Sequence, residues 1–130
     1  MIRRRFWVYL AAAYGGLAWW PARALGLAEI VQWLAFAANE IQHSLCRARL
    51  IRRFGEPVNA EAALQGSNTT LAVLDQRLSD KAWLAIGRPS IVDCAVHPYV
   101  ALGGIDLEPH RNLARWIDGV EGLPGYPAKP

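Results

Sequence analysis

Apolar residues recur at intervals of three and four positions along most of this chain, which is the spacing that lines up one face of an α-helix. The longest such pattern runs from Gly26 to Phe54 and stops at Gly55, a residue type that commonly follows the last turn of a helix. Its predicted buried face consists of Leu27, Val31, Leu34, Ala38, Ile41 and Leu45. A second face of the same helix mixes aromatic and polar side chains, namely Trp33, Phe36, Glu40, His43 and Arg47.

Two further helices show the same periodicity. After a restart at Pro57, Val58 and Asn59, an antiparallel partner helix carries an apolar stripe made of Ala63 or Leu64, Ser67, Leu71, Leu74 and Leu78. The run from Gly66 to Thr70 has low helix propensity, so a bend can form there, but its small side chains permit close approach of a neighbouring helix. The last predicted helix, around residues 110–121, buries Leu113, Trp116, Ile117 and Val120 and stops at Gly122.

A capping box predicts the start of the central helix. The Ser90 hydroxyl can accept from the backbone N–H of Asp93, whose carboxylate can accept from the N–H of Ser90. Almost no charge follows up to Leu102, and a helix that is apolar nearly all round belongs in a core. Pro98 is expected to kink this helix or end it early. His97 precedes it, and no Asp or Cys partner for His97 is evident in the sequence.

Composition indicates one globular all-α domain. Of 130 residues, 53% are hydrophobic and 19% charged, which excludes a disordered chain, and a net charge of +3 is too small to indicate nucleic-acid binding. Cys46 and Cys94 have neither the spacing of a disulfide framework nor that of a zinc site, so no metal is expected and a reducing cytoplasm fits best. The sequence shows no phosphate loop, H-x-x-x-H or G-x-S-x-G motif, so no catalytic residue is predicted.

Residues 25–126 resemble the C-terminal helical domain of glutathione S-transferases. In that family the interior helix opens with a Ser/Thr-x-x-Asp box, as at Ser90 and Asp93, and a later helix bears a Trp and ends in Leu-Pro-Gly-aromatic, as at Trp116 and residues 123–126. Residues 33–41 are similar to the first helix of that domain. The resemblance implies a helical bundle over residues 25–130.

The first 24 residues allow two interpretations. Arg3, Arg4 and Arg5, followed by an apolar run from Phe6 to Trp20 and by Ala22-Arg23-Ala24, imitate a secretory signal. A membrane span is not expected, because the apolar run is short and interrupted by glycines. Residues 7–16 also resemble the last helix of the thioredoxin-like domain of the family, so that residues 1–24 are that helix plus a linker. We favour this second interpretation, which predicts a cytoplasmic rather than a secreted protein.

The resemblance also implies what activity to expect. In the family, the residue that activates the thiolate of glutathione lies in the thioredoxin-like domain, so this chain is expected to be a truncated homologue that is inactive alone. Glutathione would then be a co-substrate only where a thioredoxin-like chain completes the site in trans, and a non-enzymatic protein-binding module is the other alternative. The mixed face is the candidate wall of the hydrophobic-substrate site, although a solvated or domain-covered surface is the more ordinary explanation.

A helical domain of this family is expected to have partners. The resemblance implies a homodimer or a thioredoxin-like partner chain, and neither nucleic acid nor a membrane is expected to bind. An apolar patch of Trp33 and Phe36, with Trp7, Trp19 and Trp20 nearby, would drive such association, with the N-terminal helix folded back over part of it.

Overall fold

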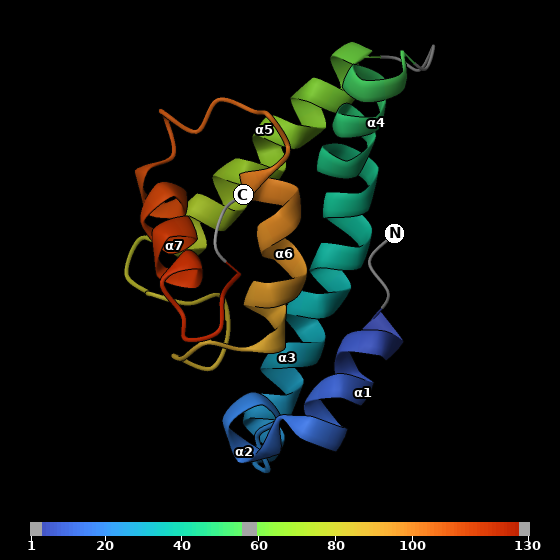
Figure 1. The fold of residues 1–130 in the computed structure, drawn as a ribbon. Helices are drawn as coiled ribbons and strands as arrows, with labels where there is room; N and C mark the ends of the chain where they lie inside the picture. Colours follow the sequence, from blue (N-terminus) through green and yellow to red (C-terminus); the bar gives the residue numbers. More distant parts are fainter. Residues whose placement is uncertain (1–3, 56–59, 128–130) are drawn as a thin grey trace.

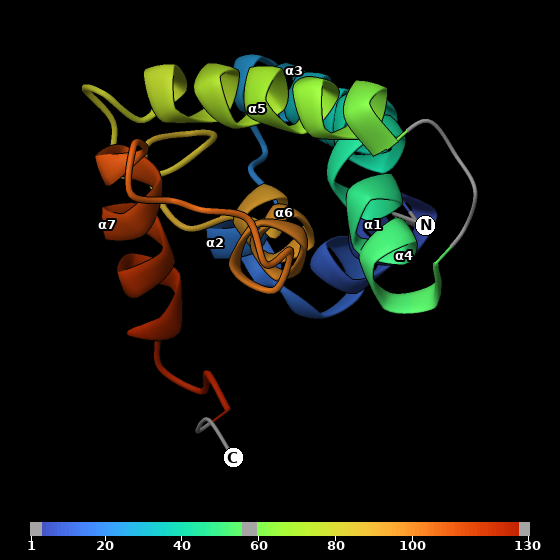
Figure 2. The same ribbon diagram turned by 90° about the horizontal axis from the view of Figure 1, so that it is seen from above.

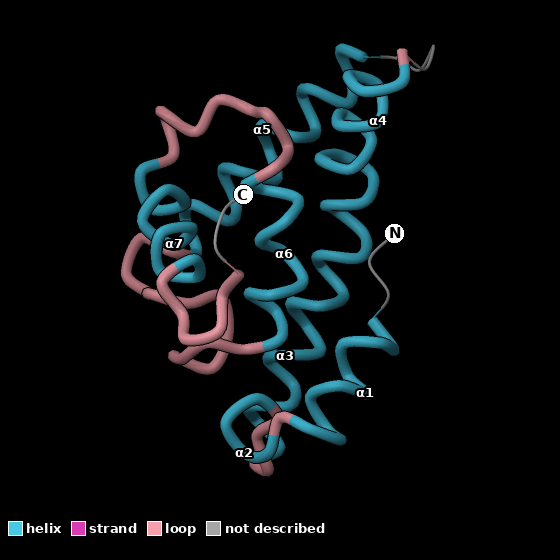
Figure 3. Tube along the Cα trace, in the orientation of Figure 1, coloured by secondary structure: helices cyan, strands magenta, loops and turns pink. Residues whose placement is uncertain are grey.

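The computed structural model describes residues 4–55 and 60–127, and these residues form helices without any strand. Their elements are α1 (Arg4–Tyr14), α2 (Gly16–Trp19), α3 (Ala24–Phe36), η1 (Ala37–Cys46), α4 (Arg47–Phe54), α5 (Ala60–Arg77), α6 (Ile91–Ala101) and α7 (Arg111–Glu121). The expected all-α class is therefore confirmed (Figure 3). Residues 57–59, where the sequence predicts a restart, lie outside the described residues. None of the described helices is long and apolar enough to span a membrane.

Helix α6 occupies the centre of the bundle, as predicted. The rod formed by α3, η1 and α4 runs along one side of it, α7 lies on the other side, and α1 crosses the lower end (Figure 1). In the view from above, α5 lies along the upper edge of the picture, α6 lies near its centre and α7 lies at its left (Figure 2). Helix α6 packs against η1, α3, α7 and α1. Such surroundings explain why its sequence is apolar nearly all round.

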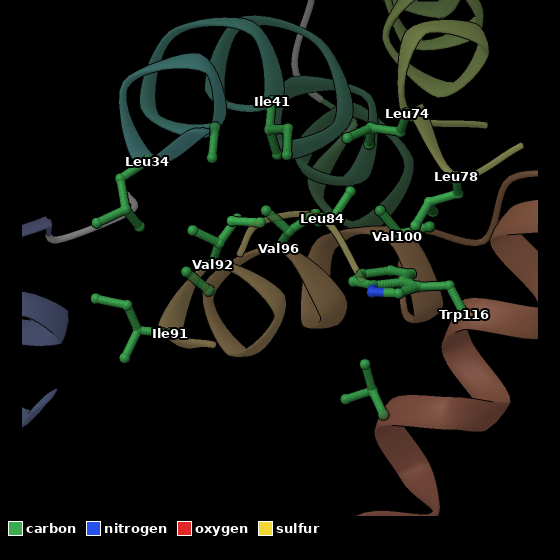
Figure 4. Close-up of a cluster of buried hydrophobic side chains, with 14 of the residues drawn as sticks. Leu34, Ile41, Leu74, Leu78, Leu84, Ile91, Val92, Val96, Val100 and Trp116 are labelled. Carbon is green, nitrogen blue, oxygen red and sulfur yellow. The ribbon is translucent and has the colours of Figure 1, made fainter. Parts of the chain in front are cut away.

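The core is one cluster centred on α6. Val92, Val96 and Val100 extend from α6 toward side chains of the long rod, of α5 and of α7 (Figure 4). The fully buried partners in that figure include Leu34, Ile41, Leu74, Leu78, Leu84 and Trp116. On α5 the predicted stripe is confirmed, with Ala63 rather than Leu64 as its first member, because Ala63 is 5% exposed and Leu64 is 49% exposed.

The long N-terminal rod departs from a regular α-helix. Its middle part, η1, is π-helical, and this change of pitch is not predicted by the sequence. The predicted buried face is wrong at Val31, which is 56% exposed, whereas the neighbouring Ile30 is fully buried. Gly55 ends the rod as predicted, with φ of 65° and its N–H 2.9 Å from the Ile51 carbonyl oxygen.

Small side chains join α5 to η1. The hydroxyl oxygens of Ser44 and Thr70 are 3.0 Å apart and buried, and a Cβ built at Gly66 would lie 3.5 Å from the Ser44 Cβ. Ser67 donates to the Ala63 carbonyl within its own helix at 2.7 Å. The run from Gly66 to Thr70, which has low helix propensity, therefore allows α5 and η1 to approach each other closely. Helix α5 continues through this run without interruption.

Pro98 neither breaks α6 nor ends it at once. The helix continues to Ala101, and the N–H of Leu102 donates to the Pro98 carbonyl at 3.2 Å. Proline removes one backbone donor, and this loss falls near the end of the helix, where few residues follow. The helix therefore continues for three residues beyond Pro98 before it ends.

Candidate functional site

The N-terminus of α6 is organised by Ser90 and Asp93. Both halves of the capping box are present, and the Ser90 N–H donates to Asp93 Oδ2 at 2.9 Å. The Ser90 hydroxyl donates to the same oxygen at 3.1 Å and accepts from the N–H of Val92 at 3.2 Å. Because both residues are fully buried, these bonds satisfy groups that water cannot reach.

The other oxygen of Asp93 ties two more segments to α6. The Leu84 N–H donates to Asp93 Oδ1 at 3.0 Å, and the Trp116 indole N–H donates to it at 2.8 Å. Burial raises the pKa of the Asp93 carboxyl, while the bonds from Leu84, Trp116 and Ser90 oppose that rise. This carboxylate is enclosed and saturated with donors, so its role is to hold the fold rather than to meet a substrate.

His97 has an acidic neighbour that the sequence did not reveal. Its Nε2 atom lies 3.5 Å from Glu121 Oε1, at the end of α7. Its ring also meets Trp116 and Tyr126, with centroids 6.0 and 5.6 Å away. His97 is 5% exposed, so it lies in the packing between α6, α7 and the segment that follows α7.

The aromatic members of the candidate wall lie together at the lower part of the rod. Trp33 and Phe36 are half-buried, and their rings meet edge to face with centroids 5.3 Å apart. The Arg77 guanidinium of α5 lies over the Trp33 ring at 5.0 Å and also pairs with Glu29. One face of the Trp33 ring is therefore covered by a side chain of the same protein.

The polar members of the candidate wall are exposed. Glu40 accepts a hydrogen bond from its neighbour Asn39 at 2.8 Å, and His43 and Arg47 extend along the same side of η1 and α4. Among the described residues, no hydrogen bond or ion pair joins these three side chains to one another or to the aromatic pair. They form a continuous helical face rather than a closed site.

A cavity of about 280 Å³ lies next to this face, between α4 and α6. It is lined by Cys46, Arg49, Leu50, Arg53, Phe54 and Tyr99. The lining residues of the rod recur at helical spacing, and Leu50 and Phe54 continue the face of His43 and Arg47 toward the end of α4. Nothing in the sequence shows that Tyr99 of α6 lies opposite the arginines of α4.

A second cavity, of about 370 Å³, lies between α1 and α6. Its lining is mostly apolar and includes Trp7, Tyr14, Trp19 and Cys94. Burial, assisted by the charge of Asp93, raises the pKa of the Cys94 thiol to about 11. The thiol is therefore protonated at neutral pH and is a poor nucleophile.

The described residues contain no cluster of His, Cys, Asp and Glu side chains that could hold a metal ion. Cys46 and Cys94 are both free thiols. Of the predicted apolar patch, Trp7, Trp19, Trp20, Trp33 and Phe36 are all half-buried and pack against the core. The large exposed side chains near the N-terminus are instead Phe6, Tyr9, Tyr14 and Leu17.

Comparison with solved structures identifies the fold. A glutathione S-transferase from Xanthobacter autotrophicus Py2 matches 97% of this chain with a TM-score of 0.85 and 23% identity. A delta-class glutathione transferase of Nilaparvata lugens matches 92% with a TM-score of 0.81 and 26% identity. Ure2p5 of Phanerochaete chrysosporium, cocrystallised with 1-(S-glutathionyl)-2,4-dinitrobenzene, matches 91% with a TM-score of 0.79 and 19% identity.

The chain spans 64%, 58% and 61% of the lengths of these three structures. No protein-family model matches the sequence, and a search of curated proteins finds no match either. The arrangement around α6 agrees with the resemblance carried by Ser90, Asp93 and Trp116. The chain therefore has the fold of the C-terminal helical domain of glutathione S-transferases.

Proposed function

We propose that this chain supplies the electrophile-binding side of a glutathione transferase site and that it does not conjugate glutathione by itself. The observation that carries the proposal is the match to glutathione transferases along nearly the whole chain, together with the cavity that opens beside the candidate wall. One matched protein was cocrystallised with a glutathione conjugate of dinitrobenzene, so an aromatic electrophile is the substrate class that we assign.

The residues proposed to meet this electrophile lie on the exposed side of the rod. Phe36, Glu40, His43 and Arg47 form the face, and Leu50 and Phe54 carry it into the cavity. Apolar and aromatic groups on this face would hold an aromatic ring, and the polar groups would orient its substituents. Trp33 packs against Phe36, and the Arg77 guanidinium lies over the Trp33 ring. We therefore assign Trp33 to holding Phe36 in place rather than to facing the ligand.

The chemistry itself requires a thiolate. In an aromatic conjugation the sulfur of glutathione forms a bond to a ring carbon, a halide leaves with the bonding electrons, and the thiol proton goes to a base or to solvent. The enzyme must therefore lower the pKa of the glutathione thiol with a donor aimed at the sulfur. Burial raises the pKa of both thiols of this chain, and we assign thiolate activation to a thioredoxin-like domain, which binds glutathione as co-substrate.

Calorimetry and a conjugation assay test this proposal. The 130-residue chain is expected to show no saturable binding of glutathione up to millimolar concentration and no conjugation of 1-chloro-2,4-dinitrobenzene. Joining it behind the thioredoxin-like domain of a matched transferase is expected to restore conjugation, and that domain alone is the control. Activity on simply mixing the two chains would favour completion in trans. Micromolar binding of glutathione by this chain alone would contradict the assignment.

A further inference from the structure

The cavity between α4 and α6 has two positively charged residues in its lining. These two residues, Arg49 and Arg53, are separated by one helical turn, so they lie on the same side of α4. The other lining groups are the Cys46 thiol, the Tyr99 hydroxyl and the side chains of Leu50 and Phe54. Among the residues that the structure describes, no carboxylate lines this cavity.

The Cys46 thiol and the Tyr99 hydroxyl do not offset the positive charges of the two arginines. Burial raises the pKa of the Cys46 thiol and of the Tyr99 hydroxyl, and Arg49 opposes both rises without cancelling them. Both groups are therefore neutral at pH 7. Arg49 lines the cavity together with Cys46 of the rod and Tyr99 of α6.

The two arginines also differ from Arg52, Arg77, Arg88 and Arg115, whose guanidinium groups are bonded to other groups of the protein. Arg52, between them in sequence, turns away and donates to the carbonyl oxygens of Gly103 and Gly104. Arg88 donates to the Leu17 and Ala18 carbonyls at 2.7 and 3.0 Å. Within the described residues, no carboxylate or carbonyl of the protein is bonded to Arg49 or Arg53.

The remaining surface of the cavity is apolar and uncovered. Phe54 is 67% exposed and Leu50 is 45% exposed, although both line a hollow that would accept an apolar group. The Arg53 guanidinium lies 5.7 Å from the centre of the Phe54 ring, which holds a positive charge beside an aromatic surface. A volume of about 280 Å³ suits a small ligand.

We infer that this cavity binds the carboxylate of a small aromatic acid, so that the electrophile of the transferase is an acidic aromatic compound. The fork of an arginine side chain matches a carboxylate in bidentate geometry, and Tyr99 can donate a further hydrogen bond. The ring of the acid would lie against Leu50 and Phe54. The assignment of a carboxylate site stands on the cavity, whereas its role in substrate choice rests on the proposed function.

Binding of 3,5-dinitrobenzoate to the 130-residue chain tests this inference, with 3,5-dinitrobenzamide as the neutral probe of the same shape. Calorimetry at low salt is expected to show saturable binding of the acid, about tenfold or more tighter than that of the amide, because hydrogen bonds to charged groups are the strong ones. The variants Arg49→Gln and Arg53→Gln are each expected to weaken binding of the acid about tenfold. Arg111→Gln, at an exposed position of α7, removes the same charge and is expected to change binding less than twofold.

Equal affinity for the acid and the amide, an equal loss in Arg111→Gln, or no saturable binding of the acid would each overturn the inference. This test needs no glutathione and no second domain. A negative result would therefore overturn the carboxylate site without deciding the proposed function. If the joined protein bound the carboxylate but did not conjugate glutathione, only the transferase role would be contradicted. Circular dichroism of each variant shows whether a loss of binding reflects unfolding.

Discussion

The indole N–H of Trp116 lies 2.8 Å from Asp93 Oδ1, although the two residues are 23 positions apart in sequence. This bond joins α7 to the N-terminus of α6, and the same oxygen accepts from the backbone of Leu84. The capping box therefore does more than begin a helix. It holds α6, α7 and the segment before α6 at one buried point.

Replacing Trp116 by Phe is expected to lower the free energy of unfolding by about 2 kcal/mol, because the change removes a buried hydrogen bond to a charged group and leaves a small void. Chemical denaturation at pH 7 measures the effect. Trp83→Phe is the matched control, since Trp83 is half-buried and its indole N–H makes no hydrogen bond in the described part of the chain. A loss at Trp116 no larger than that at Trp83 would show that the bond contributes little.

Asp93 is expected to give an unusual dependence of stability on pH. Its pKa in the folded chain is raised by burial above the ordinary value of 3.8, so the folded chain holds the proton more tightly than the unfolded chain does. Lowering the pH from neutral toward 3.8 therefore stabilises the folded chain through this group, and the gain disappears as the pH rises through the folded pKa.

The variant Asp93→Asn lacks this titration and isolates it. The unfolding free energy of the natural chain minus that of the variant is expected to increase as the pH falls from 7 to about 4.5. Other titrating groups cancel in this difference. A decrease would mean that the donors from Leu84, Ser90 and Trp116 outweigh burial and depress the pKa of Asp93.

Local pattern was sufficient to predict the rod, α5, α6, α7 and most of the core, whereas α2 lies in a stretch predicted to be a linker. The stripe on α5 and the start of α6 follow from periodicity and capping chemistry, which act between residues close in sequence. The choice of Val31 over Ile30 failed because both are apolar and adjacent, so only packing decides which one faces the core. The π-helical pitch of η1 has no comparable local signal.

The parts of the candidate site that the sequence missed are pairings across the fold. His97 and Glu121 lie on different helices, and Tyr99 meets Arg49 only because α6 packs beside the rod. Trp33 was placed on the substrate wall from its helical position, but Arg77 of α5 covers its ring. Such contacts depend on tertiary packing, which cannot be inferred from the local pattern of a sequence.

Association is expected to involve α1 rather than the half-buried tryptophans. Phe6, Tyr9 and Tyr14 are 53%, 61% and 76% exposed, so the outer side of this helix presents apolar surface to water. The chain is expected to self-associate at tens of micromolar in light scattering, and Phe6→Glu with Tyr9→Glu is expected to shift it toward monomer. The double variant Leu64→Glu and Val73→Glu, at exposed positions of α5, adds the same charge and should leave association unchanged. A monodisperse monomer of the natural chain would contradict this expectation.

Ser90 is expected to stabilise the chain more than an ordinary helix cap. An exposed cap contributes about 1 kcal/mol, but Ser90 is fully buried and its hydroxyl takes part in two hydrogen bonds, so Ser90→Ala is expected to cost about 2 kcal/mol. Ser90→Thr keeps the hydroxyl and should cost less. Ser79→Ala provides the control, because the Ser79 hydroxyl donates to the Gln76 carbonyl at 2.8 Å but is exposed.

Amide hydrogen exchange locates the effect of that substitution. In the natural chain the slowest amides are expected within residues 91–100, since α6 packs against η1, α3, α7 and α1. In Ser90→Ala the amides of the first turn of α6 should exchange faster than those of its middle, because the first turn loses its cap while Val96 and Val100 remain packed. If the slowest amides instead lay in α5 or the rod, α6 would not be the most stable element, and the central role assigned to Ser90 and Asp93 would be wrong.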